Sequence, residues 1–159
     1  AYLAVVLHEF NEPASDDLDY RIARREAHQA DNALALAWQD MQMEPSKFRQ
    51  FRRRALRLTY LNHALLSFIS AFGAHRGSAQ KTRDEVLSMG RKILEVLGSK
   101  SKSPQERKDS FSLIDHEVRE KIQEGWPEGI HQQFLLLYNI AETGRQLADE
   151  EMNFPALKH

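Results

Sequence analysis

Hydrophobic residues recur every three or four positions along most of the chain, which is the spacing of the buried face of an α-helix. The runs with this period cover about residues 16–43, 46–72, 79–97, 104–124 and 130–151. Only seven glycines and five prolines interrupt the 159 residues, and the one β-like run, residues 2–7, is short. The pattern therefore predicts an all-α protein, an antiparallel bundle of about five helices, two of them long, because short links favour antiparallel neighbours.

The first long helix carries an apolar stripe that consists mostly of alanine. The stripe comprises Tyr20, Ala23, Ala27, Ala30, Leu34, Ala37 and Met41. Small side chains let a neighbouring helix approach closely, and the sequence leaves open whether the helix predicted over residues 79–97 or the one over residues 130–151 covers this face. Glu44-Pro45 is expected to end the helix, because proline disfavours helical backbone at the residue before it.

The second long helix has a basic first half. Its arginine cluster places five arginines within nine residues: Arg49, Arg52, Arg53, Arg54 and Arg57. Arg49, Arg53 and Arg57 are spaced by four and share one face of a helix. Such a face can bind phosphate, an anionic lipid head group or an acidic partner. It can equally be a solvated face that is paired with carboxylates of neighbouring helices.

The second half of the same helix, residues 58–72, is almost free of charge. It is too short to span a bilayer, which takes about 20 apolar residues. Four polar residues interrupt it: Asn62, His63, Ser67 and Ser70. A thin polar stripe that suits an interface between helices is formed by Thr59, His63, Ser67 and Ser70. We therefore expect a core helix with a basic first half.

Composition and motifs exclude several classes of function. The formal net charge of −1, from 22 basic and 23 acidic residues, argues against a dedicated nucleic-acid binder. The absence of cysteine excludes disulfides, thiolate metal sites and cysteine nucleophiles. No phosphate loop or nucleophile motif occurs, so no catalytic residue is predicted. Glu128 and His131 form a single Glu-x-x-His pair, whereas a di-iron bundle needs two, so we expect neither metal nor cofactor.

Two stretches together resemble a known family. They are YRIARREAHQADNALALAWQDMQMEP, residues 20–45, and LRLTYLNHALLSFISAFGAHR, residues 56–76. They are similar to the cytoplasmic C-terminal region of the FUSC family, the fusaric-acid-resistance-type inner-membrane proteins, in particular its YccS-like branch. The positions that carry the pattern are Tyr20, Arg21, Arg24, Arg25, Ala27, Ala30, Glu44 and Pro45. The resemblance implies that they serve helix packing and domain assembly.

The resemblance also implies a location and a role. Family members have two blocks of transmembrane helices, each followed by a cytoplasmic helical region, and some export aromatic acids. Residues 1–12 would then be a membrane-proximal segment, the end of a preceding transmembrane helix, or else a short buried segment of this domain. Residues 13–159 would be a cytoplasmic bundle on the bacterial inner membrane.

We expect this bundle to be non-enzymatic. Its expected partners are the membrane part of the same protein, anionic lipid head groups or a second copy, and not nucleic acid. One alternative is a soluble helical adaptor or regulatory module that binds an acidic partner or a small anion. Another is a bundle enzyme or metal carrier built on Glu128 and His131.

Overall fold

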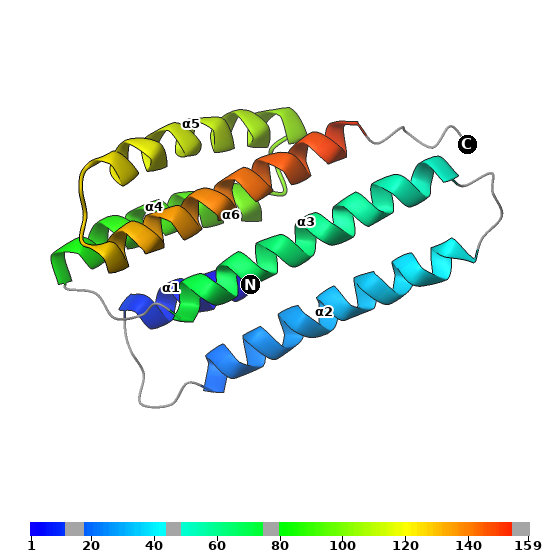
Figure 1. Ribbon diagram of the computed structural model, residues 1–159, viewed down its shortest axis with the longest axis horizontal. Coiled ribbons are helices and arrows are strands. Elements are labelled where there is room, and N and C mark those ends of the chain that lie inside the picture. Colours follow the sequence, from blue (N-terminus) through cyan, green and yellow to red (C-terminus); the bar gives the residue numbers. More distant parts are fainter. Residues whose placement is uncertain (12–17, 44–48, 75–79, 154–159) are drawn as a thin grey trace.

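The computed structural model of the chain describes residues 1–11, 18–43, 49–74 and 80–153 (Figure 1). Within these ranges it contains six helices and no strand: α1 (Tyr2–Asn11), α2 (Leu18–Gln42), α3 (Arg49–Ala74), α4 (Gln80–Gly98), α5 (Pro104–Gln123) and α6 (Glu128–Met152). The prediction of an all-α bundle is confirmed, with one helix more than expected.

The helices lie side by side, with α6 packed against α3, α4 and α5 (Figure 1). Helices α5 and α6 form one antiparallel hairpin, and α2 and α3 form another. Helix α2 lies on the outer side of the second hairpin. Among the described helices it contacts only α3 and α1. One side of α2 is therefore left without a neighbouring helix.

The β-like run at the start of the chain is helical, as part of α1. Its buried residues are Tyr2, Leu3, Val6, Leu7 and Phe10. Their spacing of three and four is helical, whereas the run of six apolar residues alone is too short to distinguish a strand from a helix. The ring of Phe10 stacks on that of Phe72 with centroids 4.6 Å apart. Helix α1 thus belongs to the core of the bundle.

Two glycines mark where helices approach most closely. A Cβ on Gly144 of α6 would lie 2.6 Å from Cζ of Phe111 of α5. A Cβ on Gly90 of α4 would lie 2.5 Å from Cδ2 of Leu7 of α1. Cβ atoms essentially never come this close to another heavy atom, so an alanine at either position would require the facing side chain to shift.

The alanine stripe of α2 faces its neighbour only along part of its length. Tyr20 is buried and Ala27 half-buried, but Ala30 and Ala37 are exposed. The buried position in the middle of the helix belongs to Asp31 instead. The predicted stripe repeats every 3.5 residues, whereas a helix turns every 3.6, so the stripe drifts about 20° around the helix per heptad. Neither of the two helices expected to cover the stripe does so, because in the described part of the chain α2 contacts α3 and α1 and does not contact α4 or α6.

Candidate functional site

The beginning of α2 is fixed where three helices meet, at a cluster that we call the tyrosine junction: Tyr2, Tyr20, Ser70 and Gly73. The Tyr2 hydroxyl lies 3.3 Å from the Tyr20 hydroxyl and 3.4 Å from Ser70 Oγ. Burial raises the pKa of the Tyr2 hydroxyl to about 12. A Cβ on Gly73 would lie 3.1 Å from the Tyr20 hydroxyl, so α3 needs a small residue there. Tyr20 is thus packed where α1, α2 and α3 meet.

The middle of α2 is joined to α3 by a second group, the polar clasp, formed by Asp31, Asn62 and His63. The Asn62 amide donates to Asp31 Oδ1 at 3.0 Å, and His63 Nδ1 lies 2.6 Å from Asp31 Oδ2. Only 8% of the Asp31 side chain is exposed, against 66% of His63. A buried carboxylate is costly unless hydrogen bonds satisfy it, and here each oxygen accepts one.

In the polar clasp an aspartate orients a histidine ring, as in some catalytic sites. The surrounding groups decide whether this pair can act in catalysis. An ionised carboxylate only accepts, which makes His63 Nδ1 the donor and turns Nε2 outward. The hydroxyl one turn further on does not serve as a nucleophile for the ring, because Ser67 Oγ donates to the His63 backbone carbonyl at 2.9 Å. The geometry therefore favours a link between helices over a catalytic pair.

The sequence indicated only part of this clasp. Asn62 and His63 were predicted as interruptions of an apolar run, and only His63, with Thr59, Ser67 and Ser70, as part of a polar stripe at a helix interface. His63 contacts Asp31 of α2, whereas Ser67 is exposed. Asp31 was missed because it lies one position away from the alanine stripe. The signal that could have identified Asp31 was its isolation in the sequence, because it is the only charged residue in the stretch 27–38 apart from His28.

The structure divides the arginine cluster among different roles. The Arg52 guanidinium donates to the backbone carbonyl of Gln42 at 3.2 Å, at the end of the α2–α3 hairpin where the chain passes from one helix to the other. Arg57 forms an ion pair with Glu150 of α6 at 2.5 Å. Arg53 is exposed, and Arg54 is half-buried. The cluster is thus partly a set of links between α3 and its neighbours and partly a free basic surface.

Near this end of the hairpin, Trp38 Nε1 and Arg54 Nη1 are covered and have no hydrogen-bond acceptor among the described residues. Buried donors without acceptors are rare, and they mark this end as less fully satisfied than the tyrosine junction. The predicted residues Glu44 and Pro45, and the Arg49 side chain, lie outside the described part of the chain. Arg21, Arg24 and Arg25 are exposed on α2.

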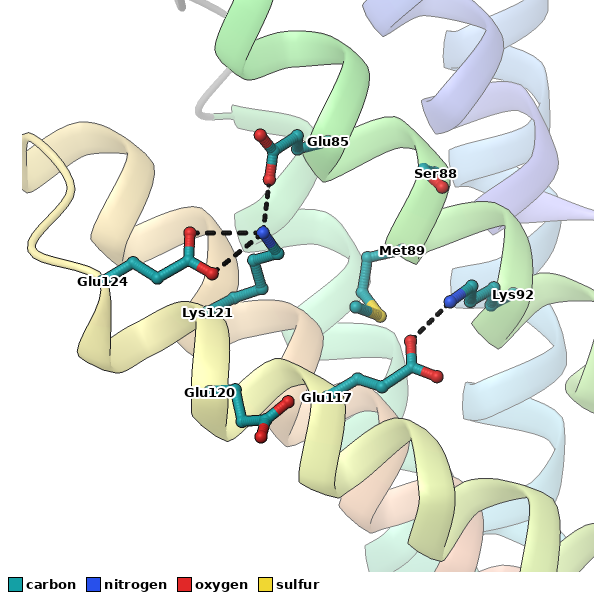
Figure 2. A pocket seen from close by; sticks show the side chains of 8 residues that line it. All are labelled: Glu85, Ser88, Met89, Lys92, Glu117, Glu120, Lys121 and Glu124. Atoms are coloured by element: carbon teal, nitrogen blue, oxygen red, sulfur yellow. Dashed lines mark hydrogen bonds and ion pairs between the residues drawn. The ribbon is translucent and has the colours of Figure 1, made fainter.

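A cleft of about 340 Å³ lies between α4 and α5 and is lined mainly by charged residues (Figure 2). Lys121 forms ion pairs with Glu85 at 2.7 Å and Glu124 at 3.0 Å, and Lys92 pairs with Glu117. The hydrogen bond to Glu85 and that to Glu124 raise the pKa of Lys121. The pairs Lys121–Glu85 and Lys92–Glu117 join α4 to α5, although the four glutamates of the cleft outnumber its two lysines.

A second polar group joins α5 to α6. Arg119 donates to Asp115 at 2.8 Å and to the Tyr138 hydroxyl at 2.7 Å. Beside it, Arg145 binds Glu142 through two hydrogen bonds of 2.7 and 2.8 Å, and this contact lowers the pKa of Glu142. The cations and carboxylates of this group are paired with each other, which is typical of a structural network.

Among the described residues, no group of three or more His, Cys, Asp or Glu side chains lies close enough together to hold a metal ion. None of the described helices is both long enough and apolar enough to cross a membrane.

Comparison with known proteins relates part of the chain to an inner-membrane protein. The chain is 44% identical to inner membrane protein YccS of Escherichia coli K12 over 87 residues, which are 55% of this chain and 12% of that protein. It is also 44% identical to an uncharacterized protein of Haemophilus influenzae over 75 residues, 47% of this chain and 10% of that protein. No protein-family model and no solved structure matches the chain. The chain is therefore a helical protein similar to a small part of YccS.

Proposed function

We propose that the chain is a non-enzymatic cytoplasmic domain of an inner-membrane protein of the FUSC family, YccS-like branch, and that it serves assembly or regulation of the membrane part. The observation that carries the proposal is the 44% identity to inner membrane protein YccS over 87 residues. The geometry supports it, because the charged groups of the clefts and of the polar clasp are engaged in links between helices. The export of organic anions such as aromatic acids would be the work of the full-length protein.

The arginine cluster is the surface that we propose to face the membrane. Arg53 is exposed, and Arg52 and Arg54 flank it at half-buried positions. Each lysine or arginine near an anionic lipid surface contributes about 1 kcal/mol to binding. A cluster of this size therefore supports weak, salt-sensitive binding that assists a membrane anchor elsewhere in the protein.

Fractionation of the full-length native gene product tests the location. The proposal expects the protein in the inner-membrane fraction after an alkaline wash, with residues of this domain cut by protease only after the inner membrane is opened. Recovery of the full-length product in the wash supernatant would contradict it and would favour the adaptor module.

Co-sedimentation with vesicles tests the surface. Wild type is expected to bind vesicles that contain phosphatidylglycerol, and the Arg52→Glu/Arg53→Glu/Arg54→Glu variant to lose most of this binding. A variant with the same change of charge elsewhere, Arg91→Glu/Lys100→Glu/Lys102→Glu, is the control. Arg53→Glu alone separates binding from folding because Arg53 is exposed. Equal binding of wild type and the cluster variant would contradict the proposal that the arginine cluster binds anionic lipid.

A further inference from the structure

The side of α2 that points away from α3 carries a regular stripe of exposed residues, the outer stripe. It comprises Leu18, Ile22, Arg25, Gln29, Ala33, Leu36, Asp40 and Met43, which directly follows the helix. The spacing of three and four keeps these residues on one face, about half a turn from the buried Tyr20 and Asp31. A 25-residue helix is about 37 Å long at 1.5 Å per residue, so the stripe runs along the whole outer edge of the molecule.

Large apolar side chains gather on this hairpin. Eight large hydrophobic residues are exposed in the described part of the chain. Seven of them lie on α2, on α3 or directly after α2: Leu18, Ile22, Leu34, Leu36, Met43, Leu56 and Tyr60. On the outer stripe itself, Leu36 is 60% and Met43 is 90% exposed. Single exposed hydrophobic residues are normal on a protein surface, but a row of them along an unpartnered helix marks an interaction surface.

The outer stripe is complementary to itself when two copies lie antiparallel. A two-fold axis that crosses the helix between Asn32 and Ala33 places Ile22 of one copy opposite Met43 of the other. The same axis places Arg25 opposite Asp40, and because the contact is isologous this pair occurs twice.

The remaining positions fit the same arrangement. Gln29 falls opposite Leu36, and Glu26, beside the stripe, falls opposite Gln39, so no like charges meet. Ala33 lies next to the axis, where its small side chain lets the two backbones approach. A parallel arrangement would instead bring Arg25 against Arg25 and Asp40 against Asp40, which is unfavourable.

We propose that the outer stripe of α2 binds the outer stripe of a second copy in an antiparallel, two-fold symmetric helix pair. The inference deepens the assembly role proposed above and rests on it. A lipid surface fits the stripe less well, because Arg25, Gln29 and Asp40 alternate with its apolar residues. A single pair of helices lies at the small end of stable interfaces, so the dissociation constant should be on the order of micromolar.

Charge reversal gives the decisive experiment, with sedimentation velocity of the purified chain from low micromolar to submillimolar concentration as the measurement. Wild type is expected to dimerise over this range. Arg25→Asp places aspartate opposite Asp40 at both ends of the pair, and Asp40→Arg does the same with arginine. Each single variant should weaken dimerisation by about tenfold or more.

The matched rescue follows from the symmetry. The variant Arg25→Asp/Asp40→Arg restores both pairs with reversed sign and should dimerise nearly as well as wild type. A mixture of the two single variants should form a heterodimer, because every opposed pair in it is again unlike in charge. The substituted side chains are exposed, so all variants should keep the helical circular dichroism of wild type.

Three results would overturn the pairing: a monomer at every concentration, a dimer that neither single variant weakens, or failure of the mixture to associate. Vesicle binding that is lost in Ile22→Asp/Leu36→Asp while the chain stays monomeric would assign the stripe to lipid and also overturn it. A monomer whose full-length protein still fractionates with the inner membrane would leave the proposed function standing. A dimer whose full-length protein is recovered in the wash supernatant would leave the pairing standing and contradict the proposed function.

Discussion

Helices α2 and α6 have the same length, 25 residues each, and opposite environments. Nine residues of α6 are buried, among them Phe134, Leu137 and Ile140, which have no exposed surface. In α2 only Tyr20 and Asp31 are buried. Helix α6 packs against three long neighbours, whereas α2 packs along its length against α3 alone.

The difference shows how differently two helices of one bundle are stabilised. Helix α6 is held by apolar area removed from water over most of its circumference, at about 25 cal/mol per Å². Helix α2 is held at particular points, the tyrosine junction and the polar clasp, because its alanines offer little area to bury. A helix held in this way leaves its other face available to a partner.

The largest contrast is expected from truncating one large side chain in each helix. Phe134→Ala should lower the free energy of unfolding by about 3–5 kcal/mol, because it leaves a cavity in a fully buried site. Leu36→Ala, on the exposed face of α2, should change it by less than about 0.5 kcal/mol. Urea denaturation followed by circular dichroism measures both. Equal losses would show that α2 is as deeply buried as α6.

A smaller effect is expected at the polar clasp. Asp31→Ala removes the shared acceptor of Asn62 and His63 and should cost about 1–2 kcal/mol. Hydrogen exchange should show the loss in α2 and not in α6, because α2 can open without α6. Asn32→Ala, the exposed neighbour, is the control and should leave exchange unchanged. Faster exchange throughout α6 in Asp31→Ala would mean that the two helices unfold as one unit.

The smallest effect is expected at the tyrosine junction, as a dependence on alkaline pH. Burial raises the pKa of Tyr2 from about 10 to about 12, so the fold favours the protonated hydroxyl. This contribution is complete below pH 10 and is lost as the pH rises from about 10 through 12. Tyr2→Phe should flatten the decline in urea midpoints over that range, and Tyr60→Phe should keep it. A decline of unchanged slope in Tyr2→Phe would place its origin elsewhere.

Most of the fold could be predicted from the sequence, because the spacing of apolar residues is nearly continuous. Val86, Ile93, Phe111 and Val118 lie in the runs with helical spacing at 79–97 and 104–124 and are buried. Helix α1 was not among the predicted helices of the bundle, because a run of six apolar residues is too short to distinguish a strand from a helix. The alanine stripe of α2 was expected to stay on one buried face, but a 3.5-residue repeat drifts around a helix of 3.6 residues per turn over seven turns.

The candidate site was less predictable, because it depends on which residues of different helices meet. The arginine spacing identified a basic face, but nothing local to the cluster shows that Arg57 reaches Glu150, which is 93 positions away. The polar clasp likewise joins residues that are about 30 positions apart. Pairings of this kind follow from the register between helices, and alanine-rich faces specify register weakly.

The place of α1 in the core has a consequence for the order of events during synthesis. Leu7 of α1 fills the space that Gly90 leaves on α4, and Phe10 stacks on Phe72 of α3. Within this chain, Gly90 is translated about 80 residues after Leu7, and Phe72 about 60 residues after Phe10. The apolar face of α1 therefore cannot complete its packing until α4 has been synthesised.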